Sequence, residues 1–219
     1  SDALGASSNT FSMLNDADLE FPIVTDDDGQ TVQLSQGVYD QLIQSTQPEV
    51  RKMAFKQLYS TYHQFIHTLA STLAGNVKTH NFDASVHHYD SARQAALNRN
   101  HIPVAVYDAL VTSVNAHLPL LHRYVALRKK ILQLPELHMY DLYTPITGEP
   151  QLSYTFETAK AEALKALAVL GPDYLSHVQT AFDSRWIDVV ENKGKRSGAY
   201  SGGMYDTAPY MLLNWQDNL

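Results

Sequence analysis

The sequence predicts a mainly α fold of the α+β class, in which long helices are joined to small β segments. Apolar residues recur at spacings of three and four through several long stretches, which is the period of one helix face. Pro48, Pro103 and Pro172 stand where such stretches begin, and the first turn of a helix tolerates proline. Two short segments near the N-terminus and one near the C-terminus have the composition of strands.

The first 34 residues predict one helix and one β-hairpin. Residues 3–14 predict a helix, and residues 19–24 and 31–34 predict paired strands. Residues 26–30 predict the turn between them, with Gly29 where φ is positive. The acidic triplet 26–28 could also suggest a calcium loop, but the EF-hand spacing requires a glutamate where Ser35 stands. We therefore interpret this segment as a hairpin turn.

Four helices are predicted in the next hundred residues. Ser35 has the character of an N-cap for a short helix that ends near residue 43. A long helix is expected from Pro48 to about residue 79, and another over residues 82–98. The helix that begins at Pro103 should continue to about residue 131 and be kinked by Pro119, which lies inside it.

The last 80 residues predict two more helices and a terminal strand. Residues 137–145 predict a short strand or extended piece, and residues 155–170 and 172–187 predict helices separated by Gly171. Residues 193–203 are rich in glycine, and residues 210–215 predict a buried or half-buried strand. Asp217 and Asn218 after a strand are typical of the start of another helix, so we expect a fragment of a longer protein.

Composition excludes several classes of protein. The chain has 219 residues, no cysteine and a net charge of −7, so disulfide scaffolds, cysteine-ligated metals and thiol nucleophiles are excluded. Residues 1–50 hold nine acidic residues and no Lys or Arg, and no basic stripe indicates a nucleic-acid partner. The longest uninterrupted apolar runs are far shorter than the roughly 20 residues that span a bilayer, so no membrane partner is expected.

One sequence pattern resembles a metal site. His63 and His67 have the spacing of the two histidines in the H-E-x-x-H zinc motif, but Gln64 replaces the glutamate that acts as general base. Both histidines lie off the apolar stripe of the predicted helix. We interpret them as exposed helix residues and expect no metal ligand and no catalytic residue in this chain.

The glycine-rich segment is the most informative part of the C-terminal region. It lacks both the order of a phosphate-binding loop and the G-x-S-x-G pattern of a serine hydrolase. Its glycines allow the backbone to approach a ligand closely, and Pro209 suits the start of an edge strand. An edge strand can pair with an extended peptide, although an ordinary loop and hairpin would have the same local features.

Long ordered stretches resemble the oligoendopeptidase F family of zinc metallopeptidases, which are relatives of thimet oligopeptidase. The resemblance covers most of the chain, from about residue 4 to residue 219. The matching stretches are ASVHHYDSARQAAL (84–97), HLPLLHRY (117–124), HMYDLY (138–143), RWIDV (185–189), ENKGKRSGAY (191–200) and NWQDN (214–218).

The resemblance implies a mostly helical fold with a deep channel and a small sheet beside a catalytic helix. Family members cleave short peptides with one zinc ion, held by H-E-x-x-H and a later glutamate. In such proteins the NWQDN stretch lies just before the catalytic helix. The chain would then end before the zinc site and be inactive alone, with residues 1–185 as helical channel wall and residues 186–219 as the start of the catalytic subdomain. Zinc is expected in the full-length parent and none in this chain.

The same resemblance suggests where a peptide would lie. Residues 209–215 resemble the zincin strand that aligns an extended substrate. The candidate substrate-binding residues are Arg196, Ser197, Gly198, Tyr200, Tyr205, Leu213, Asn214 and Trp215. The expected partners are short peptides and the missing C-terminal catalytic segment, and the expected location is the cytoplasm.

Two further expectations concern the isolated chain. The alternative function is a non-catalytic helical module that binds peptides or a partner helix. Apolar surface is expected to be exposed around Met211, Leu213 and Trp215, which would make the chain self-associate.

Overall fold

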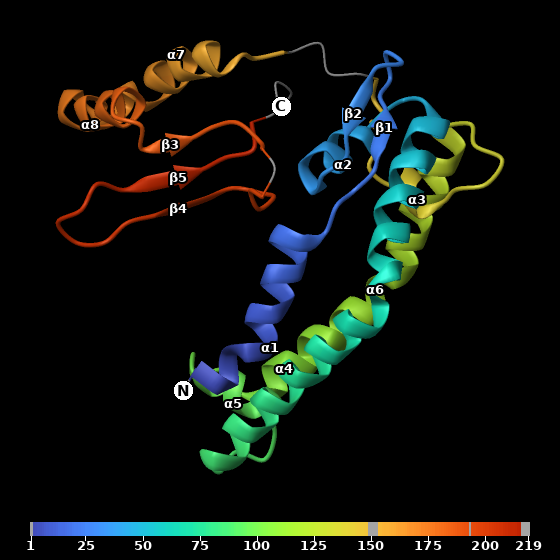
Figure 1. The fold of residues 1–219 in the computed structure, drawn as a ribbon, viewed down its shortest axis with the longest axis vertical. Coiled ribbons are helices and arrows are strands. Elements are labelled where there is room, and N and C mark those ends of the chain that lie inside the picture. Colours follow the sequence, from blue (N-terminus) through green and yellow to red (C-terminus); the bar gives the residue numbers. More distant parts are fainter. Residues whose placement is uncertain (1, 149–152, 193, 216–219) are drawn as a thin grey trace.

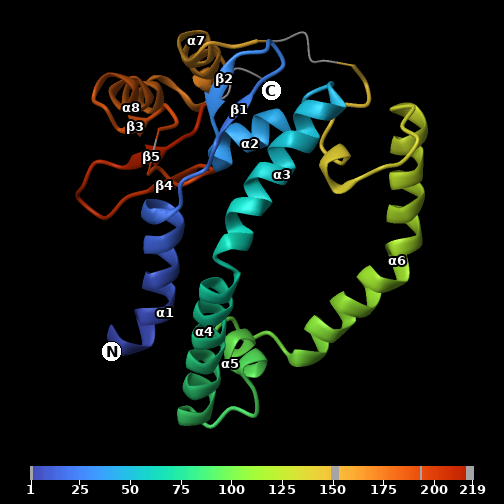
Figure 2. The same cartoon turned by 45° about the vertical axis from the view of Figure 1, so that its right-hand side comes forward.

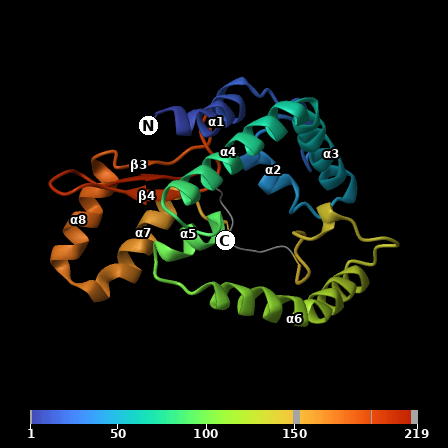
Figure 3. The same cartoon turned by 90° about the horizontal axis from the view of Figure 1, so that it is seen from below.

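The computed structural model describes residues 2–148, 153–192 and 194–215, and within them the fold is mainly helical, as predicted. Figure 1 shows the helices α3 (Pro48–Gln64), α4 (Ile66–Val86) and α6 (Val104–Ile131) along the longest axis of the molecule. Figure 2 and Figure 3 show that α6 lies on the opposite side of the molecule from α3 and α4. These long helices therefore do not form one closed bundle.

The N-terminal region begins with α1 (Asp2–Met13), which packs beside α4, and continues into a π-helical turn, η1 (Leu14–Asp18). The predicted hairpin is confirmed, with β1 (Ile23–Thr25) antiparallel to β2 (Thr31–Gln33). The carboxylate of Asp26 accepts hydrogen bonds from the amides of Asp28 (3.0 Å) and Gln30 (2.8 Å), and Gly29 has a φ of +77°. Asp26 therefore builds the turn.

A small hydrophobic core joins the hairpin to α2 (Gln36–Leu42) and α3. Its buried members are Val24, Leu34, Leu42, Ala54 and Leu58. As predicted, the hydroxyl of Ser35 caps α2 by accepting a hydrogen bond from the amide of Val38 (3.1 Å). Burial, with smaller contributions from Tyr59 and Asp40, raises the pKa of Tyr39 beside this core to about 12.

The predicted helix boundaries between residues 48 and 98 are wrong. The chain leaves the helical conformation at Phe65, so α3 and α4 are separate helices, and α4 continues to Val86. His88 has a φ of +60°, which prevents α4 from continuing into α5 (Ala92–Asn98). The hydroxyl of Ser91 then starts α5 by accepting a hydrogen bond from the amide of Gln94 (3.1 Å).

The α6 helix is confirmed, and Pro119 lies inside it without ending it. Figure 2 shows that α6 bends midway along its length, in agreement with the predicted kink. Within the described residues, α6 is the one helix long and apolar enough to cross a bilayer, and none of its apolar stretch is buried inside the structure. Length and composition alone do not distinguish a membrane span from a helix that packs against protein.

A buried cluster of charged and polar groups ties α3 and α6 together. The segment predicted to be extended instead contains a 3₁₀ turn, η2 (Met139–Asp141), because Asp141 accepts a hydrogen bond from the amide of His138 (2.8 Å). Asp141 also forms an ion pair with Arg51 of α3. Arg128 of α6 donates to the carbonyls of Asp141 (3.0 Å) and Thr144 (2.5 Å).

The C-terminal region holds α7 (Phe156–Leu167), a 3₁₀ turn, η3 (Ala168–Leu170), and α8 (Pro172–Asp183). The second helix ends before the expected residue 187, because Arg185 has a φ of +58° and Ile187 belongs to β3 (Ile187–Asp188). With β4 (Tyr200–Gly202) and β5 (Tyr210–Leu212), β3 forms a three-stranded sheet, and α7 and α8 lie on one side of it (Figure 1).

The apolar surface of the chain lies elsewhere than expected. Met211, Leu213 and Trp215 are half-buried. The large exposed apolar side chains gather instead on α4 and α6, and they include Leu73, Phe82, Leu110, Val114 and Leu121. Exposed apolar side chains on two helices that lie apart are two separate surfaces, and surfaces of this kind are typically covered by another protein segment.

We therefore expect the isolated chain to self-associate through α4 and α6. Replacing Leu110 and Leu121 by glutamine should shift the sedimentation profile toward monomer, because it removes apolar area from the α6 surface. The same double substitution at Met211 and Leu213 should leave the association unchanged. A purely monomeric profile of the unmutated chain at high concentration would contradict this prediction.

Candidate functional site

The glycine-rich loop that precedes β4 is held in a defined conformation. The side-chain amide of Asn214 donates to the carbonyl oxygens of Arg196 (2.9 Å) and Gly198 (2.7 Å). Gly198 has a φ of +84°, a conformation that side chains disfavour, so a glycine is required where the loop turns toward β4. The loop backbone is therefore fastened to the segment that follows β5.

Lys195 fastens the same loop to the segment that follows β3. Its ammonium lies 3.0 Å from a carboxylate oxygen of Asp188 and donates to the carbonyl of Val190 (2.7 Å). Only 4% of its side chain is exposed. Lys195 is thus a structural cation here and is turned away from solvent.

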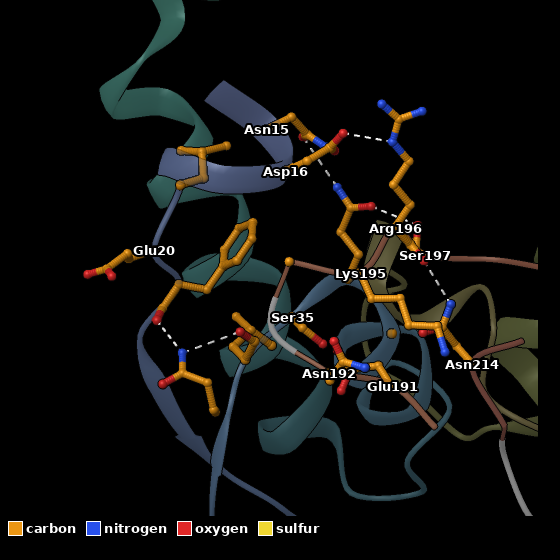
Figure 4. A pocket seen from close by; sticks show the side chains of 17 residues that line it. Asn15, Asp16, Glu20, Ser35, Glu191, Asn192, Lys195, Arg196, Ser197 and Asn214 are labelled. Atoms are coloured by element: carbon orange, nitrogen blue, oxygen red, sulfur yellow. Dashed lines mark hydrogen bonds and ion pairs between the residues drawn. The ribbon is translucent and has the colours of Figure 1, made fainter. Parts of the chain in front are cut away.

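A cavity of about 400 Å³ lies between this loop and the N-terminal region. Of the candidate residues, Arg196, Ser197 and Asn214 line it. Its opposite wall comes from η1, the hairpin and α2 (Figure 4). None of the candidate site residues predicted from the sequence belongs to that wall, because its residues lie more than 150 positions away from the loop along the chain.

Two direct contacts cross from the loop to that wall. The guanidinium Nε of Arg196 lies 2.7 Å from a carboxylate oxygen of Asp16, and the hydroxyl of Ser197 donates to the side-chain oxygen of Gln36 (2.7 Å). Figure 4 shows Arg196 reaching toward Asp16, while Glu20 points away from this group. The loop is therefore joined to both the C-terminal sheet and the N-terminal region.

The remaining candidate residues do not line the cavity. Tyr200 is 52% exposed on β4 and makes an edge-to-face contact with Tyr210, with ring centroids 5.9 Å apart. Tyr205 is 95% exposed in the connection between β4 and β5. The amide of Leu213 donates to Asp188, and the Trp215 ring packs against Phe156 at 5.3 Å. Leu213 therefore holds the segment after β5 to β3, and Trp215 packs against α7.

The strand order corrects the expected edge strand. The order is β3-β5-β4, so β5 is paired on both sides and Pro209 does not start an edge strand. Within the described residues, the free edge beside the glycine-rich loop belongs to β4.

The hydrogen-bond pattern shows which groups β4 presents at that edge. The amides of Met211 and Leu213 donate toward β3, to the carbonyls of Trp186 (2.7 Å) and Asp188 (2.8 Å). Because the direction of the backbone N–H and C=O alternates along a strand, those of residues 210 and 212 point toward β4. Ser201 lies opposite Met211, so its own N–H and C=O point away from β5, to the free edge. The side of Ser201 that faces away from β5 can therefore pair with another strand.

The described residues do not fit a zinc ion. His63 and His67 are both exposed, and the helix is interrupted at Phe65 between them. In the parts of the chain that the structure describes, no group of three His, Asp or Glu side chains is placed to hold a metal.

Comparison with known proteins gives a single family. The family model described as "Peptidase family M3" matches residues 41–219. The chain is 53% identical to oligopeptidase PepF of Bacillus subtilis over 219 residues. This alignment covers 100% of this chain and 33% of PepF. It is 52% identical to the group B oligopeptidase PepB of Streptococcus agalactiae, covering 100% of this chain and 36% of that protein.

A solved structure agrees with these matches. The crystal structure of oligoendopeptidase-F from Enterococcus faecium aligns with a TM-score of 0.65 and 52% identity, over 84% of this chain and 34% of that one. The chain thus spans about a third of the length of the curated relatives it matches.

Proposed function

Because the chain belongs to peptidase family M3, we propose that it is the peptide-aligning part of a zinc-dependent oligoendopeptidase. In this proposal an extended peptide adds as a strand to the free edge of β4, and the N–H and C=O of Ser201 hydrogen-bond its backbone. Main-chain pairing of this kind accepts many peptide sequences. The free edge of β4 next to the cavity is the observation that carries the proposal.

The candidate residues take different roles along this edge. We propose that Tyr200 contacts the peptide and that Arg196 and Ser197 bound the cavity near one end of β4. Gly198 would let the loop backbone approach the peptide closely. Tyr205, at the other end of the strand, would contact only longer peptides. Leu213, Asn214 and Trp215 are assigned to support, because they hold the sheet and loop in place.

The remaining expectations apply to the parent protein. We propose that its zinc is held by residues outside the described part of this chain. We further propose a cytoplasmic location, short peptides as substrates and no nucleic-acid or membrane partner. The exposed apolar face of α6 would then be covered by the C-terminal catalytic segment, with residues 1–185 forming the channel wall and residues 186–219 beginning the catalytic subdomain.

A substitution at Ser201 tests the peptide-binding edge. In the zinc-loaded parent, Ser201→Pro removes the N–H that faces outward and leaves the bonds between β4 and β5 intact, because proline is tolerated at a strand edge. Losing one backbone hydrogen bond to the substrate should lower kcat/KM for a short peptide by about 10–100-fold.

Ser201→Ala is the matched control, since it removes the hydroxyl and keeps the amide. It should retain kcat/KM within about twofold, because the proposed bonds use only the backbone. Equal activity of the two variants would contradict alignment along β4. An unmutated, folded, zinc-loaded parent that cleaves no peptide would contradict the proposed peptidase function itself.

A further inference from the structure

Six polar side chains join the glycine-rich loop to the N-terminal region through five hydrogen bonds, and the covalent link between Arg196 and Ser197 closes the ring. On one side of the ring, Arg196 binds a carboxylate oxygen of Asp16 at 2.7 Å. The other carboxylate oxygen of Asp16 accepts a hydrogen bond from the side-chain amide of Asn15 (2.8 Å). This half of the ring contains an ion pair in which the Asp16 side chain is 19% exposed and the Arg196 side chain 67% exposed, so solvent screens part of its attraction.

The other half of the ring runs through Tyr62. Ser197 donates to Gln36 (2.7 Å), and the side-chain amide of Gln36 donates to the Tyr62 hydroxyl (2.5 Å). That hydroxyl donates in turn to the side-chain oxygen of Asn15 (2.9 Å). Because Arg196 and Ser197 are neighbours in the chain, the ring closes, and its members polarise one another.

The position of the ring is set by rigid parts of the fold. The aromatic ring of Tyr62 packs against the hydrophobic core and makes an edge-to-face contact with Phe21, with centroids 5.7 Å apart. Asn15 and Asp16 lie in the π-helical turn at the end of α1, a geometry that often occurs at functional sites. The ring therefore holds the loop at a fixed place relative to the N-terminal core.

We propose that Asp16 and Gln36 are positioning residues of the peptidase, which fix Arg196 and Ser197 and thereby the start of β4. Asn214 holds the loop from the sheet side, and the ring holds it from the opposite side. Ser201 follows Ser197 by four residues, so a displaced loop displaces the strand that receives the peptide. This inference rests on the proposed function.

The first measurement uses the chain itself and does not depend on activity. In Asp16→Asn, and separately in Tyr62→Phe, exchange of the hydrogen-bonded amides of Lys195 and of Tyr200 at the start of β4 should rise about 10-fold, because the ring is opened. Tyr62→Phe keeps the contact with Phe21 and removes only the hydroxyl. Asp18→Asn is the matched control, since it neutralises an exposed carboxylate of the same turn, and it should leave the exchange unchanged.

The second measurement uses the zinc-loaded parent. Asp16→Asn should raise KM for a short peptide about 10-fold and change kcat by less than about twofold, because the loop orients the substrate and takes no part in bond cleavage. Combining Asp16→Arg with Arg196→Asp should restore the low KM, since the pair is rebuilt in reverse. A general loss of folding would not be rescued in this way.

The outcomes separate this inference from the proposed function. Unchanged amide exchange in Asp16→Asn and Tyr62→Phe would show that the ring does not hold the loop. Faster exchange with an unchanged KM would overturn only the positioning role of Asp16 and Gln36. An unmutated parent without peptidase activity overturns the proposed function, and with it the role assigned to Asp16 and Gln36. Faster exchange with a raised KM that the reversed pair restores supports the inference.

Discussion

Replacing Arg51 by methionine is expected to lower the free energy of unfolding by about 3–5 kcal/mol. Arg51 and Asp141 are each 2% exposed, and two guanidinium nitrogens contact the same carboxylate oxygen at 3.1 and 2.5 Å. A third nitrogen donates to the carbonyl of Ser45 (2.9 Å). Removing the arginine leaves the carboxylate of Asp141 buried without its cation, which is the expensive case for a buried pair.

The exposed ion pair between Arg93 and Asp108 provides the matched control. Its atoms are 2.8 Å apart, but the two side chains are 48% and 56% exposed. Arg93→Met should therefore cost no more than about 1 kcal/mol in urea unfolding measured at low protein concentration. The double variant Arg51→Met with Asp141→Leu should recover part of the lost stability, because the buried carboxylate is removed together with its cation. The recovery is incomplete because the hydrogen bond from the His138 amide is lost as well. Equal costs for Arg51→Met and Arg93→Met would contradict a buried link between α3 and the η2 segment.

Replacing Asn214 by aspartate is expected to open the glycine-rich loop. The substitution keeps the size of the side chain but removes the amide that donates to the carbonyls of Arg196 and Gly198. It also brings a negative charge toward two carbonyl oxygens. The loss of two hydrogen bonds should stabilise the open loop relative to the closed one by about 2–3 kcal/mol, so trypsin should cleave after Arg196 about 30–150 times faster.

Asn192→Asp is the control for added charge in the same cavity. The side-chain amide of Asn192 makes one long contact with the carbonyl of Val190 (3.4 Å), so its loss should change the cleavage rate little. Cleavage after Arg196 at the same rate in both variants would show that Asn214 does not fasten the loop.

The elements that could be predicted carry their signals locally. Pro172 begins α8, Ser35 caps α2 and Asp26 builds the hairpin turn, and each interaction lies within a few residues of its own element. One missed boundary also had a local signal. Ser91 followed three positions later by Gln94 has the sequence pattern of a capping box. In the structure the Ser91 hydroxyl caps α5, while the side chain of Gln94 accepts a hydrogen bond from the amide of Asp90 (2.7 Å), the residue before the cap.

Other differences had no local signal. Phe65 continues the apolar period of its helix, so periodicity could not predict that the helix is interrupted there. The free edge was assigned to the wrong strand, because strand order in a sheet depends on pairing between distant segments and not on the composition of one strand.

The candidate site also combines residues that the sequence indicates with residues that only the fold reveals. Arg196, Ser197 and Asn214 were selected through the family resemblance, and the structure brings them together at one cavity. Asp16 and Gln36 are polar residues near the N-terminus with no motif around them. Only the folded chain places them against a loop more than 150 residues later.

The most direct test of the account is a crystal structure of the zinc-loaded parent with an uncleaved peptide analogue. We predict that the peptide lies as an added strand along β4, with hydrogen bonds to the N–H and C=O of Ser201 and with one end at the cavity beside Arg196. A peptide bound elsewhere, with the edge of β4 unpaired or covered by another segment of the parent, would contradict the central claim.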